Sequence, residues 1–232
     1  MQLAQSSGAV KLGALSVKVL LIANGVISQG AKIQRLLAEA GAYCVVCADG
    51  GALQARALGL RPHTIIGDID SLRPAEVADF KAAGSVILSF PAEKDETDLE
   101  LSLLHCRDIG AESVTILGAL GGRFDQTVAN LFLLTLPTLA DMRITLVDGE
   151  QTITVLSPGR HPLVGEKGDT VSLMPLSAGV DGITTHNLKY PLNDESLPQG
   201  PARGISNVML ADRAEVSFRR GKLLLVHTLG TA

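Results

Sequence analysis

The chain has 232 residues, of which 46% are hydrophobic and 19% are charged, and this balance excludes a disordered or low-complexity protein. The net charge is −4 and only 3% of the residues are aromatic, which argues against a nucleic-acid-binding surface or a base-stacking platform. A chain of this length buries roughly 70% of its unfolded surface without metal or disulfide staples. We therefore expect one large domain or two smaller ones.

From residue 17 to about residue 148, apolar β-type runs alternate with runs of helical periodicity. This alternation predicts a parallel sheet with helices on both faces. The last predicted helix places Val128, Leu131 and Phe132 on one face, and Thr97 and Asp98 are candidate caps of the helix before it. The predicted strands are 17–23, 43–48, 63–67, 85–90, 113–117 and 143–147, and the predicted helices are 31–40, 51–58, 97–107 and 125–136.

After about residue 150 the helical periodicity disappears, and β-like runs follow that are separated by Gly, Pro, Asn and Asp. The runs are 152–156, 170–176, 214–218 and 222–228. They predict a smaller antiparallel β domain. The chain is thus expected to be α/β, with a parallel-sheet domain at 17–148 and a β domain at 149–232.

Cysteine usage and hydropathy bound the location of the protein. The three cysteines, Cys44, Cys47 and Cys106, do not indicate a disulfide framework and favour a reducing cytoplasm. Cys44 and Cys47 lie three apart in a predicted strand and would face opposite sides of the sheet, so we expect buried thiols rather than a zinc or redox centre. Residues 1–16 are expected to be a loose leader, and no uncharged stretch is long enough to span a membrane.

Four of the predicted strands in the first part of the chain end in acidic loops. The carboxyl ends of parallel strands lie along one edge of a sheet, where α/β proteins bind ligands. Each loop by itself is also typical of a turn or a helix cap, so the prediction depends on the four together. We expect their carboxylates to meet in one cleft. The loops carry Asp49, Asp68, Asp70, Asp95, Asp98 and Asp125, together with Lys94 and Arg123.

Carboxylates held close together repel each other unless a cation neutralises them. Mg²⁺ prefers oxygen ligands and is usually shared between a few carboxylates and the phosphates of a substrate. The glycines beside the aspartates let backbone N–H groups approach phosphate oxygens. The pattern therefore predicts Mg²⁺-dependent phosphoryl chemistry on a nucleotide. It is not that of a P-loop enzyme or of the usual dinucleotide-binding fold, because both glycine signatures are missing.

Taken in order, these loops resemble those of the thiamine pyrophosphokinase family, and the resemblance extends over residues 17–228. In the first part of the chain the matching motifs are Asn24-Gly25, Asp49-Gly50-Gly51, Gly67-Asp68-Ile69-Asp70-Ser71, Lys94-Asp95-Glu96-Thr97-Asp98 and Gly121-Gly122-Arg123-Phe124-Asp125. In the second part they are Gly168-Asp169-Thr170-Val171-Ser172-Leu173, Leu188-Lys189-Tyr190-Pro191-Leu192 and Ser206-Asn207.

The resemblance implies an enzyme, a thiamine diphosphokinase, that transfers a pyrophosphoryl group from ATP to the hydroxyethyl oxygen of thiamine and releases AMP. It implies a Rossmann-like α/β domain and a β-sandwich-like domain in each subunit of a homodimer. Thiamine would bind between the acidic cleft of one subunit and the β domain of the other. Neither a nucleic acid nor a membrane is expected as a partner.

The resemblance also implies a role for each matching position. Asp68, Asp70, Asp95 and Asp98 would hold Mg²⁺ and, with Arg123, form the catalytic set. Asp70 and Asp98 both remain candidates for the general base. The nucleotide would be surrounded by Asn24, Asp49, Gly50, Gly51, Lys94, Thr97, Gly121, Gly122 and Asp125, and thiamine would contact Tyr190, Ser206 and Asn207.

Three positions depart from the family pattern, and they bear on the shape of the thiamine pocket. Gln126 stands where the family often has His, Asn187 where a Gly is common, and Tyr190 where a Trp is common. Three other functions remain open. A phosphohydrolase would use Asp68 and Asp70 as its Asp-x-Asp motif, a pterin pyrophosphokinase would share the α/β domain, and a non-catalytic sensor would bind a nucleotide without turnover.

Overall fold

The computed structural model describes residues 17–230, so the leader expected at residues 1–16 lies outside the described part of the chain. The first part contains β1 (Val17–Ile22), α1 (Ala31–Ala38), η1 (Ala40–Ala42), β2 (Cys44–Ala48), α2 (Gly51–Ala57), β3 (Thr64–Gly67), α3 (Pro74–Ala82), β4 (Val86–Ser89), α4 (Asp98–Asp108), β5 (Ala111–Leu117), α5 (Phe124–Leu133), η2 (Pro137–Leu139) and β6 (Arg143–Asp148). The second part contains β7 (Gln151–Leu156), β8 (Gly159–Val164), β9 (Thr170–Pro175), β10 (Gly179–His186), β11 (Glu195–Pro198), β12 (Asn207–Val208), β13 (Arg213–Phe218) and β14 (Leu223–Thr228).

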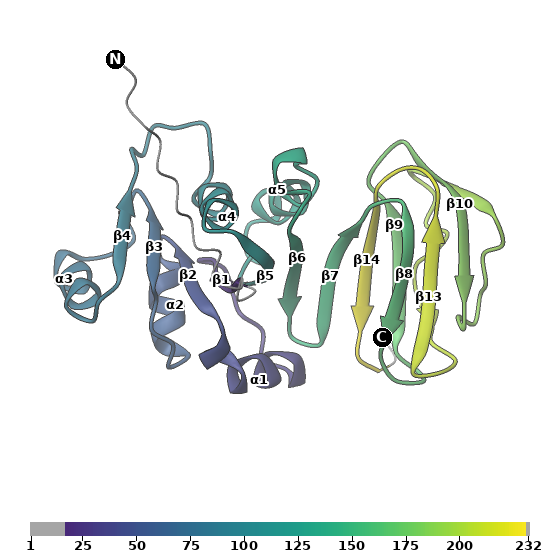
Figure 1. Cartoon of the computed structure of the whole chain (residues 1–232), viewed down its shortest axis with the longest axis horizontal. Helices are drawn as coiled ribbons and strands as arrows, with labels where there is room; N and C mark the ends of the chain where they lie inside the picture. Colours follow the sequence, from purple (N-terminus) through teal and green to yellow (C-terminus); the bar gives the residue numbers. More distant parts are fainter. Residues whose placement is uncertain (1–16, 231–232) are drawn as a thin grey trace, which may run out of the picture.

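One ten-stranded sheet runs through both parts of the molecule (Figure 1). Six of its strands are parallel, in the order β6-β5-β1-β2-β3-β4. β7 then pairs antiparallel with β6 across the tight turn at Gly149 and Glu150, and β14, β9 and β12 extend the antiparallel end. Gly149 has a φ of 54°, a left-handed conformation that glycine adopts without strain. The turn joins the parallel strands to the antiparallel ones without interrupting the sheet.

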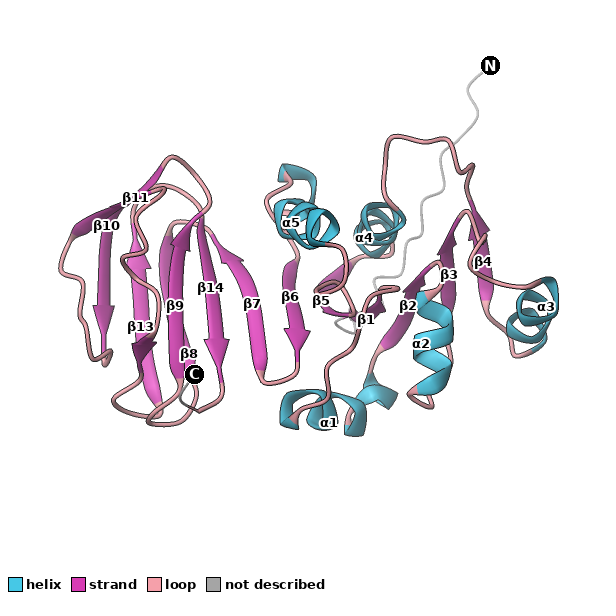
Figure 2. Ribbon diagram, turned by 180° about the vertical axis from the view of Figure 1, so that it is seen from behind, coloured by secondary structure: helices cyan, strands magenta, loops and turns pink. Residues whose placement is uncertain are grey.

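Helices cover both faces of the parallel strands (Figures 1 and 2). α4 and α5 lie on one face, and α1 and α2 lie on the other. The strand period of two explains this arrangement, because successive residues of β1 enter different cores. Val19 and Leu21 pack with α4, whereas Leu20 and Ile22 pack with α1 and α2. The predicted parallel sheet with two covered faces is confirmed.

The two CxxC cysteines divide between the same two cores. Cys44 packs against the core that contains α4, and Cys47 lies in the core on the opposite face, as the strand spacing predicted. All three cysteines are free. Burial raises the pKa of the Cys106 thiol to about 12, and it also raises that of Cys47. These two buried thiols stay protonated at neutral pH and pack as apolar groups.

The second sheet has four antiparallel strands in the order β11-β10-β13-β8. Its inner face packs on β7, β9 and β14, and the core between the two layers includes Val171, Leu173, Ile183, Val216 and Leu223. The chain is therefore an α/β protein whose parallel sheet continues into a β sandwich. In the described range, no helix is long and apolar enough to cross a membrane.

Several elements differ from the prediction. Helix α3 was not predicted, because its only buried side chains are Glu76 and Phe80, too few for a periodic apolar stripe. β8, β10, β11 and β12 were also missed. β8 is an edge strand interrupted by Pro162, which cannot donate to a strand ladder. Phe132, expected on the same face as Leu131, is 54% exposed, whereas Leu131 packs on the core.

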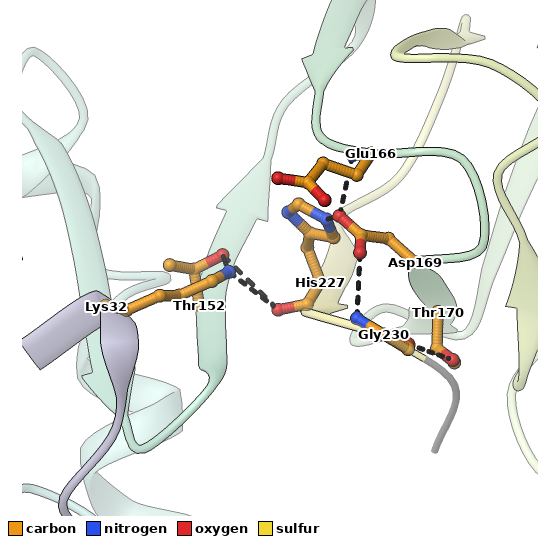
Figure 3. A network of polar contacts seen from close by, with 7 residues as sticks. All are labelled: Lys32, Thr152, Glu166, Asp169, Thr170, His227 and Gly230. Atoms are coloured by element: carbon orange, nitrogen blue, oxygen red, sulfur yellow. Dashed lines mark hydrogen bonds and ion pairs between the residues drawn. The ribbon is translucent and has the colours of Figure 1, made fainter.

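A polar network ties α1 to the antiparallel end of the sheet (Figure 3). The Lys32 ammonium donates to Thr152 Oγ1 at 3.1 Å and to the carbonyl of His227 at 3.2 Å. The ring Nε2 of His227 lies 2.7 Å from Asp169 Oδ2, and because a carboxylate only accepts, this nitrogen carries the proton. The network therefore holds α1 against β7 and β14.

Asp169 is the buried centre of this network, and we expect Asp169→Asn to lower the free energy of unfolding by about 2 kcal/mol at pH 7. Burial by itself would raise the pKa of Asp169. The N–H groups of Gly230 and Glu166, with His227, outweigh burial and hold the pKa below its usual value. A carboxylate with a lowered folded-state pKa stabilises the fold above about pH 4, and this contribution is lost as the pH falls through the folded-state pKa.

Urea unfolding of the unaltered protein and of Asp169→Asn, each at pH 7 and at pH 3, measures the contribution of the Asp169 carboxylate. The difference in unfolding free energy should narrow at the lower pH. A difference that is the same at both pH values would contradict the role given to the Asp169 carboxylate.

Candidate active site

A cavity of 670 Å³ opens at the carboxyl edge of the parallel strands, where the acidic loops were expected to meet. Its walls come from the loops that follow β1, β2 and β5, from the segment that leads into α4, and from the exposed start of α5. The residues around it include Asn24, Gly25, Asp49, Gln54, Lys94, Thr97, Asp98, Gly118, Gly121, Gly122, Arg123, Gln126 and Asn130. Most of the residues predicted for the nucleotide therefore share one cavity.

Glycines hold the loops of this cavity close together. The N–H of Gly25 donates to the carbonyl of Gly118 at 2.8 Å, and a Cβ on Gly25 would lie only 2.3 Å from that oxygen. A Cβ on Gly51 would lie 2.1 Å from the carbonyl oxygen of Ile22, so no larger residue fits there. Gly50 is packed against the side chain of Asn24 in the same way. Close packing of the turn after β2 on the end of β1 and on the loop that follows β1 thus accounts for Gly50 and Gly51.

Three carboxylates lie within metal-ligand distance of one another, and one of them, Asp49, borders this cavity. One oxygen from each of Asp49, Asp68 and Asp70 falls within 4.8 Å of the other two. Asp49 is 7% exposed, and its Oδ1 is buried without a hydrogen-bond partner in the described part of the chain. A buried carboxylate oxygen without a donor is costly unless a cation compensates it. The donor set, made only of carboxylate oxygens, fits a hard divalent cation such as Mg²⁺.

The backbone that presents these carboxylates is unusual. Asp49 has a φ of 43° and Ile69 has a φ of 65°, both in the left-handed region. This conformation is rare for a β-branched residue and costs of order 1–3 kcal/mol. Such strain persists where the surrounding structure requires it, and here it occurs at the residue between two members of the carboxylate group, Asp68 and Asp70.

Asp98 and Lys94 form an ion pair at the edge of the carboxylate cluster, with Nζ 3.0 Å from Oδ1. Burial raises the pKa of Asp98, the Lys94 ammonium opposes this rise, and the charges of Asp68 and Asp49 add to it. Asp98 therefore lies close enough to Asp68 and Asp49 for their charges to affect its pKa. The hydroxyl of Thr97 accepts the N–H of Glu100 at 3.1 Å, which confirms Thr97 as the N-cap of α4.

Arg123, Asp125 and Asp95 lie toward solvent. Arg123 borders the cavity and pairs with Asp125 at 2.6 Å, and their side chains are 73% and 65% exposed. Asp125 pairs with Arg123 but is not among the cavity residues. Asp95 is exposed and is neither beside the cavity nor in the group of three carboxylates.

Sequence reasoning missed Gln54 and Asn130, which also border the cavity. The Nδ2 of Asn130 donates to the carbonyl of Ala119 at 2.7 Å and so holds the glycine loop that follows β5. A signal for Asn130 was present, because it lies four residues after Gln126 and therefore on the same face of α5. Gln54 has no comparable signal in the sequence.

The residues predicted to contact thiamine lie in the second part of the chain. The structure brings Tyr190, Ser206 and Asn207 together, since the side chain of Asn207 accepts the N–H of Tyr190 at 2.9 Å. Tyr190 is 60% exposed, Ser206 is exposed and Asn207 is 3% exposed. None of the three borders the 670 Å³ cavity.

The continuous sheet, the β sandwich and the acidic cavity define a two-part α/β protein with a candidate site for phosphates and a metal ion, and comparison with known proteins places it among the transferases. Two family models match, "Thiamin pyrophosphokinase, catalytic domain" at residues 35–146 and "Thiamin pyrophosphokinase, vitamin B1 binding domain" at residues 152–223. Together they span most of the chain.

Individual proteins are similar over most of their length. Thiamine pyrophosphokinase from Bacillus subtilis is 29% identical over 181 residues, which cover 78% of this chain and 85% of the relative. Thiamine pyrophosphokinase 2 from Oryza sativa subsp. japonica is 30% identical over 196 residues, which cover 74% and 73%. A crystal structure of thiamine pyrophosphokinase from Bacillus subtilis has a TM-score of 0.81 at 27% identity and covers 91% of this chain and 99% of its own. The chain belongs to the thiamine pyrophosphokinase family, as its motifs indicated.

Proposed function

We propose that this protein transfers the pyrophosphoryl group of ATP to the hydroxyethyl oxygen of thiamine, giving thiamine diphosphate and AMP. The observation that carries the proposal is the carboxylate cluster of Asp49, Asp68 and Asp70 beside a cavity walled by glycine loops. Membership of the thiamine pyrophosphokinase family, with both family regions present, supports the same reaction.

Asp49, Asp68 and Asp70 would hold Mg²⁺, and Asp98 at the edge of this group would supply a further carboxylate toward the phosphates. When bound, Mg²⁺ neutralises charge on the phosphoryl oxygens. The chain contributes fixed charges and dipoles. Lys94 and Arg123 place cations at the cavity, and positioning and charge neutralisation supply most of the catalysis in phosphoryl transfer.

The glycine loop and the carboxylates divide the remaining tasks. Gly121 and Gly122 have φ values of 78° and 66° and can turn backbone N–H groups toward phosphate oxygens. The proton of the thiamine hydroxyl would pass to one of two carboxylates, either Asp70 in the cluster or Asp98 at its edge. The cationic thiazolium ring would be attracted by the same carboxylates.

We further propose a homodimer in which Tyr190 and Ser206 of one subunit complete the acidic cavity of the other. Within one chain these residues do not border the cavity, which supports an arrangement of this kind. At a thiamine concentration well below the KM, mixing Asp70→Asn subunits with Ser206→Ala subunits should give more activity than either variant alone, since one of the two sites in a mixed dimer then has both intact sets. The cytoplasm is the proposed location, because the three cysteines are free.

The other functions are less well supported. A vitamin B1 binding region at residues 152–223 favours thiamine over a pterin as the acceptor. A phosphohydrolase based on Asp68 and Asp70 would leave this region and the cavity without a role, and a sensor would not need a cluster of carboxylates with an unpartnered buried oxygen.

The deciding experiment follows AMP formation from ATP and Mg²⁺ in the presence and absence of thiamine. Thiamine-dependent AMP with an equal amount of thiamine diphosphate supports the proposal, and a chelator should abolish both products. Phosphate released regardless of thiamine would indicate a hydrolase. ATP binding without turnover would indicate a sensor once a pterin alcohol has also been tested as acceptor.

Ser206→Ala is expected to raise the KM for thiamine by about 10-fold, because one hydrogen bond to the substrate is worth about 1.4 kcal/mol. The KM for ATP should change by less than about two-fold. Steady-state kinetics with each substrate varied in turn measures both values. Ser113→Ala is the matched control, because Ser113 lies near the start of β5, at the end opposite to the loop that borders the cavity. An unchanged thiamine KM would remove Ser206 from the thiamine site.

A further inference from the structure

Both polar atoms of the Asn207 carboxamide bond to backbone groups. Its Oδ1 accepts the N–H of Tyr190 at 2.9 Å and the N–H of Val208 at 2.9 Å. Its Nδ2 donates to the carbonyl of Tyr190 at 2.7 Å. The residue is 3% exposed. The oxygen already has two donors and one amino N–H is taken by a carbonyl, so only the second N–H of a buried amino group is left for a small molecule.

These bonds replace part of a strand ladder. The segment at 187–190 runs antiparallel to 207–210, with a bridge between Leu188 and Met209 and a bond from the N–H of Lys189 to the carbonyl of Val208 at 2.9 Å. The next residue, Tyr190, bonds to a side chain instead of to a neighbouring backbone. The Asn207 carboxamide has the same donor and acceptor groups as a peptide unit, so it holds both polar groups of Tyr190 at once.

We call the two bonds between the Asn207 carboxamide and the Tyr190 backbone the clamp, and they fix the direction in which the Tyr190 side chain leaves the backbone. Leu188 and Leu192, on either side of it, are 3% and 4% exposed, whereas Tyr190 is 60% exposed. The buried leucines anchor the segment, and the Asn207 carboxamide fixes the backbone between them. Ser206 precedes Asn207 with a φ of 54°, and its N–H donates to Ser172 Oγ at 3.0 Å. Asn207 thus joins Tyr190 and Ser206, the other two residues predicted to contact thiamine.

We propose that Asn207 is a positioning residue, which acts on thiamine by fixing the backbone of Tyr190 and does not itself contact the substrate. The inference rests on the proposed function for its consequence in catalysis. The clamp itself is a property of the folded chain and can be tested without any substrate.

The first test uses Tyr190→Trp as a reporter, because the chain contains no other tryptophan. Fluorescence anisotropy and acrylamide quenching are compared between Tyr190→Trp alone and the same protein with Asn207→Ala. Loss of the clamp should lower the anisotropy and raise the quenching constant by about two-fold, since the backbone at residue 190 becomes mobile. Asn193→Ala, at an exposed asparagine three residues from Tyr190, is the control and should change neither value.

Asn207→Asp provides a second variant if Asn207→Ala unfolds. It keeps the size of the side chain but removes the Nδ2 donor and sets a carboxylate against the carbonyl of Tyr190. Unchanged anisotropy and quenching in a folded Asn207 variant would overturn the proposal, whatever the enzyme catalyses. This separates failure of the clamp from failure of the proposed function.

The second test is a double-mutant cycle on the KM for thiamine. Asn207→Ala and Tyr190→Ala should each raise it by about 10-fold, which corresponds to about 1.4 kcal/mol, and leave the KM for ATP unchanged. If Asn207 acts through Tyr190, adding Asn207→Ala to Tyr190→Ala should change the KM for thiamine by less than about two-fold. An increase equal to the product of the two single effects would identify Asn207 as a direct contact and overturn the proposal, as would an unchanged KM in the Asn207 variant alone.

Discussion

Asp70→Asn is expected to reduce kcat for thiamine diphosphate formation by at least about 100-fold, or about 2.7 kcal/mol of transition-state stabilisation. The amide keeps the shape of the side chain but removes one negative charge from the group of three carboxylates at Asp49, Asp68 and Asp70. An amide oxygen is a weaker ligand for Mg²⁺, and it cannot accept the proton of the thiamine hydroxyl.

The fold should tolerate Asp70→Asn, because the side chain of Asp70 is exposed and relief of carboxylate repulsion favours the folded state. A melting temperature equal to or above that of the unaltered protein is therefore expected. Asp79→Asn, at an exposed position on α3, is the matched control and should keep full activity. Near-normal turnover in Asp70→Asn would remove Asp70 from the catalytic set.

Lys94→Met is expected to lower kcat/KM for ATP by about 100-fold while the KM for thiamine changes little. The ammonium lies at the cavity, is paired with Asp98 at 3.0 Å, and also interacts with the charges of Asp68 and Asp49. Methionine keeps most of the side-chain volume but leaves the phosphates and the carboxylates without this fixed cation.

Steady-state kinetics at several Mg²⁺ concentrations would measure the effect of Lys94→Met. More Mg²⁺ should restore part of the activity, because a second source of positive charge then offsets the missing ammonium. Lys81→Met, at an exposed position on α3, is the control for general charge effects and should behave like the unaltered protein. Equal kcat/KM values for ATP in Lys94→Met and Lys81→Met would contradict the role given to Lys94.

Some features of the site were predictable because their signals are local. Thr97 caps α4 through a contact three residues away, and a hydroxyl residue before a helical run predicts such a cap. The acidic loops meet at one edge because the strands before them are parallel, and that topology follows from alternating apolar strands and helices. The continuous apolar run of β1 likewise predicted that both faces of the sheet would be covered, because successive residues of a strand face opposite sides.

Other features depend on distances between segments that no sequence pattern records. Asp49 joins Asp68 and Asp70 within ligand distance, whereas Asp95 is exposed, although all four follow predicted strands. The difference arises from loop conformations such as the left-handed backbone of Asp49, which residue type alone does not dictate. α3 buries only two side chains, which are too few to produce a periodic signal in the sequence, so only the folded structure shows this helix.

The sequence by itself determined the alternation of strands and helices in the first part of the chain apart from α3, the α/β class, the edge of the sheet that carries the acidic loops, and the family. These depend on residue periodicity and on short motifs, which the chain carries locally. Only the tertiary structure decided that one sheet continues through both parts, which carboxylates come together, and that the Asn207 side chain turns toward the backbone of Tyr190. The physical reason is that a buried polar atom must find a partner, and which partner lies within reach is set by packing between segments far apart in the chain.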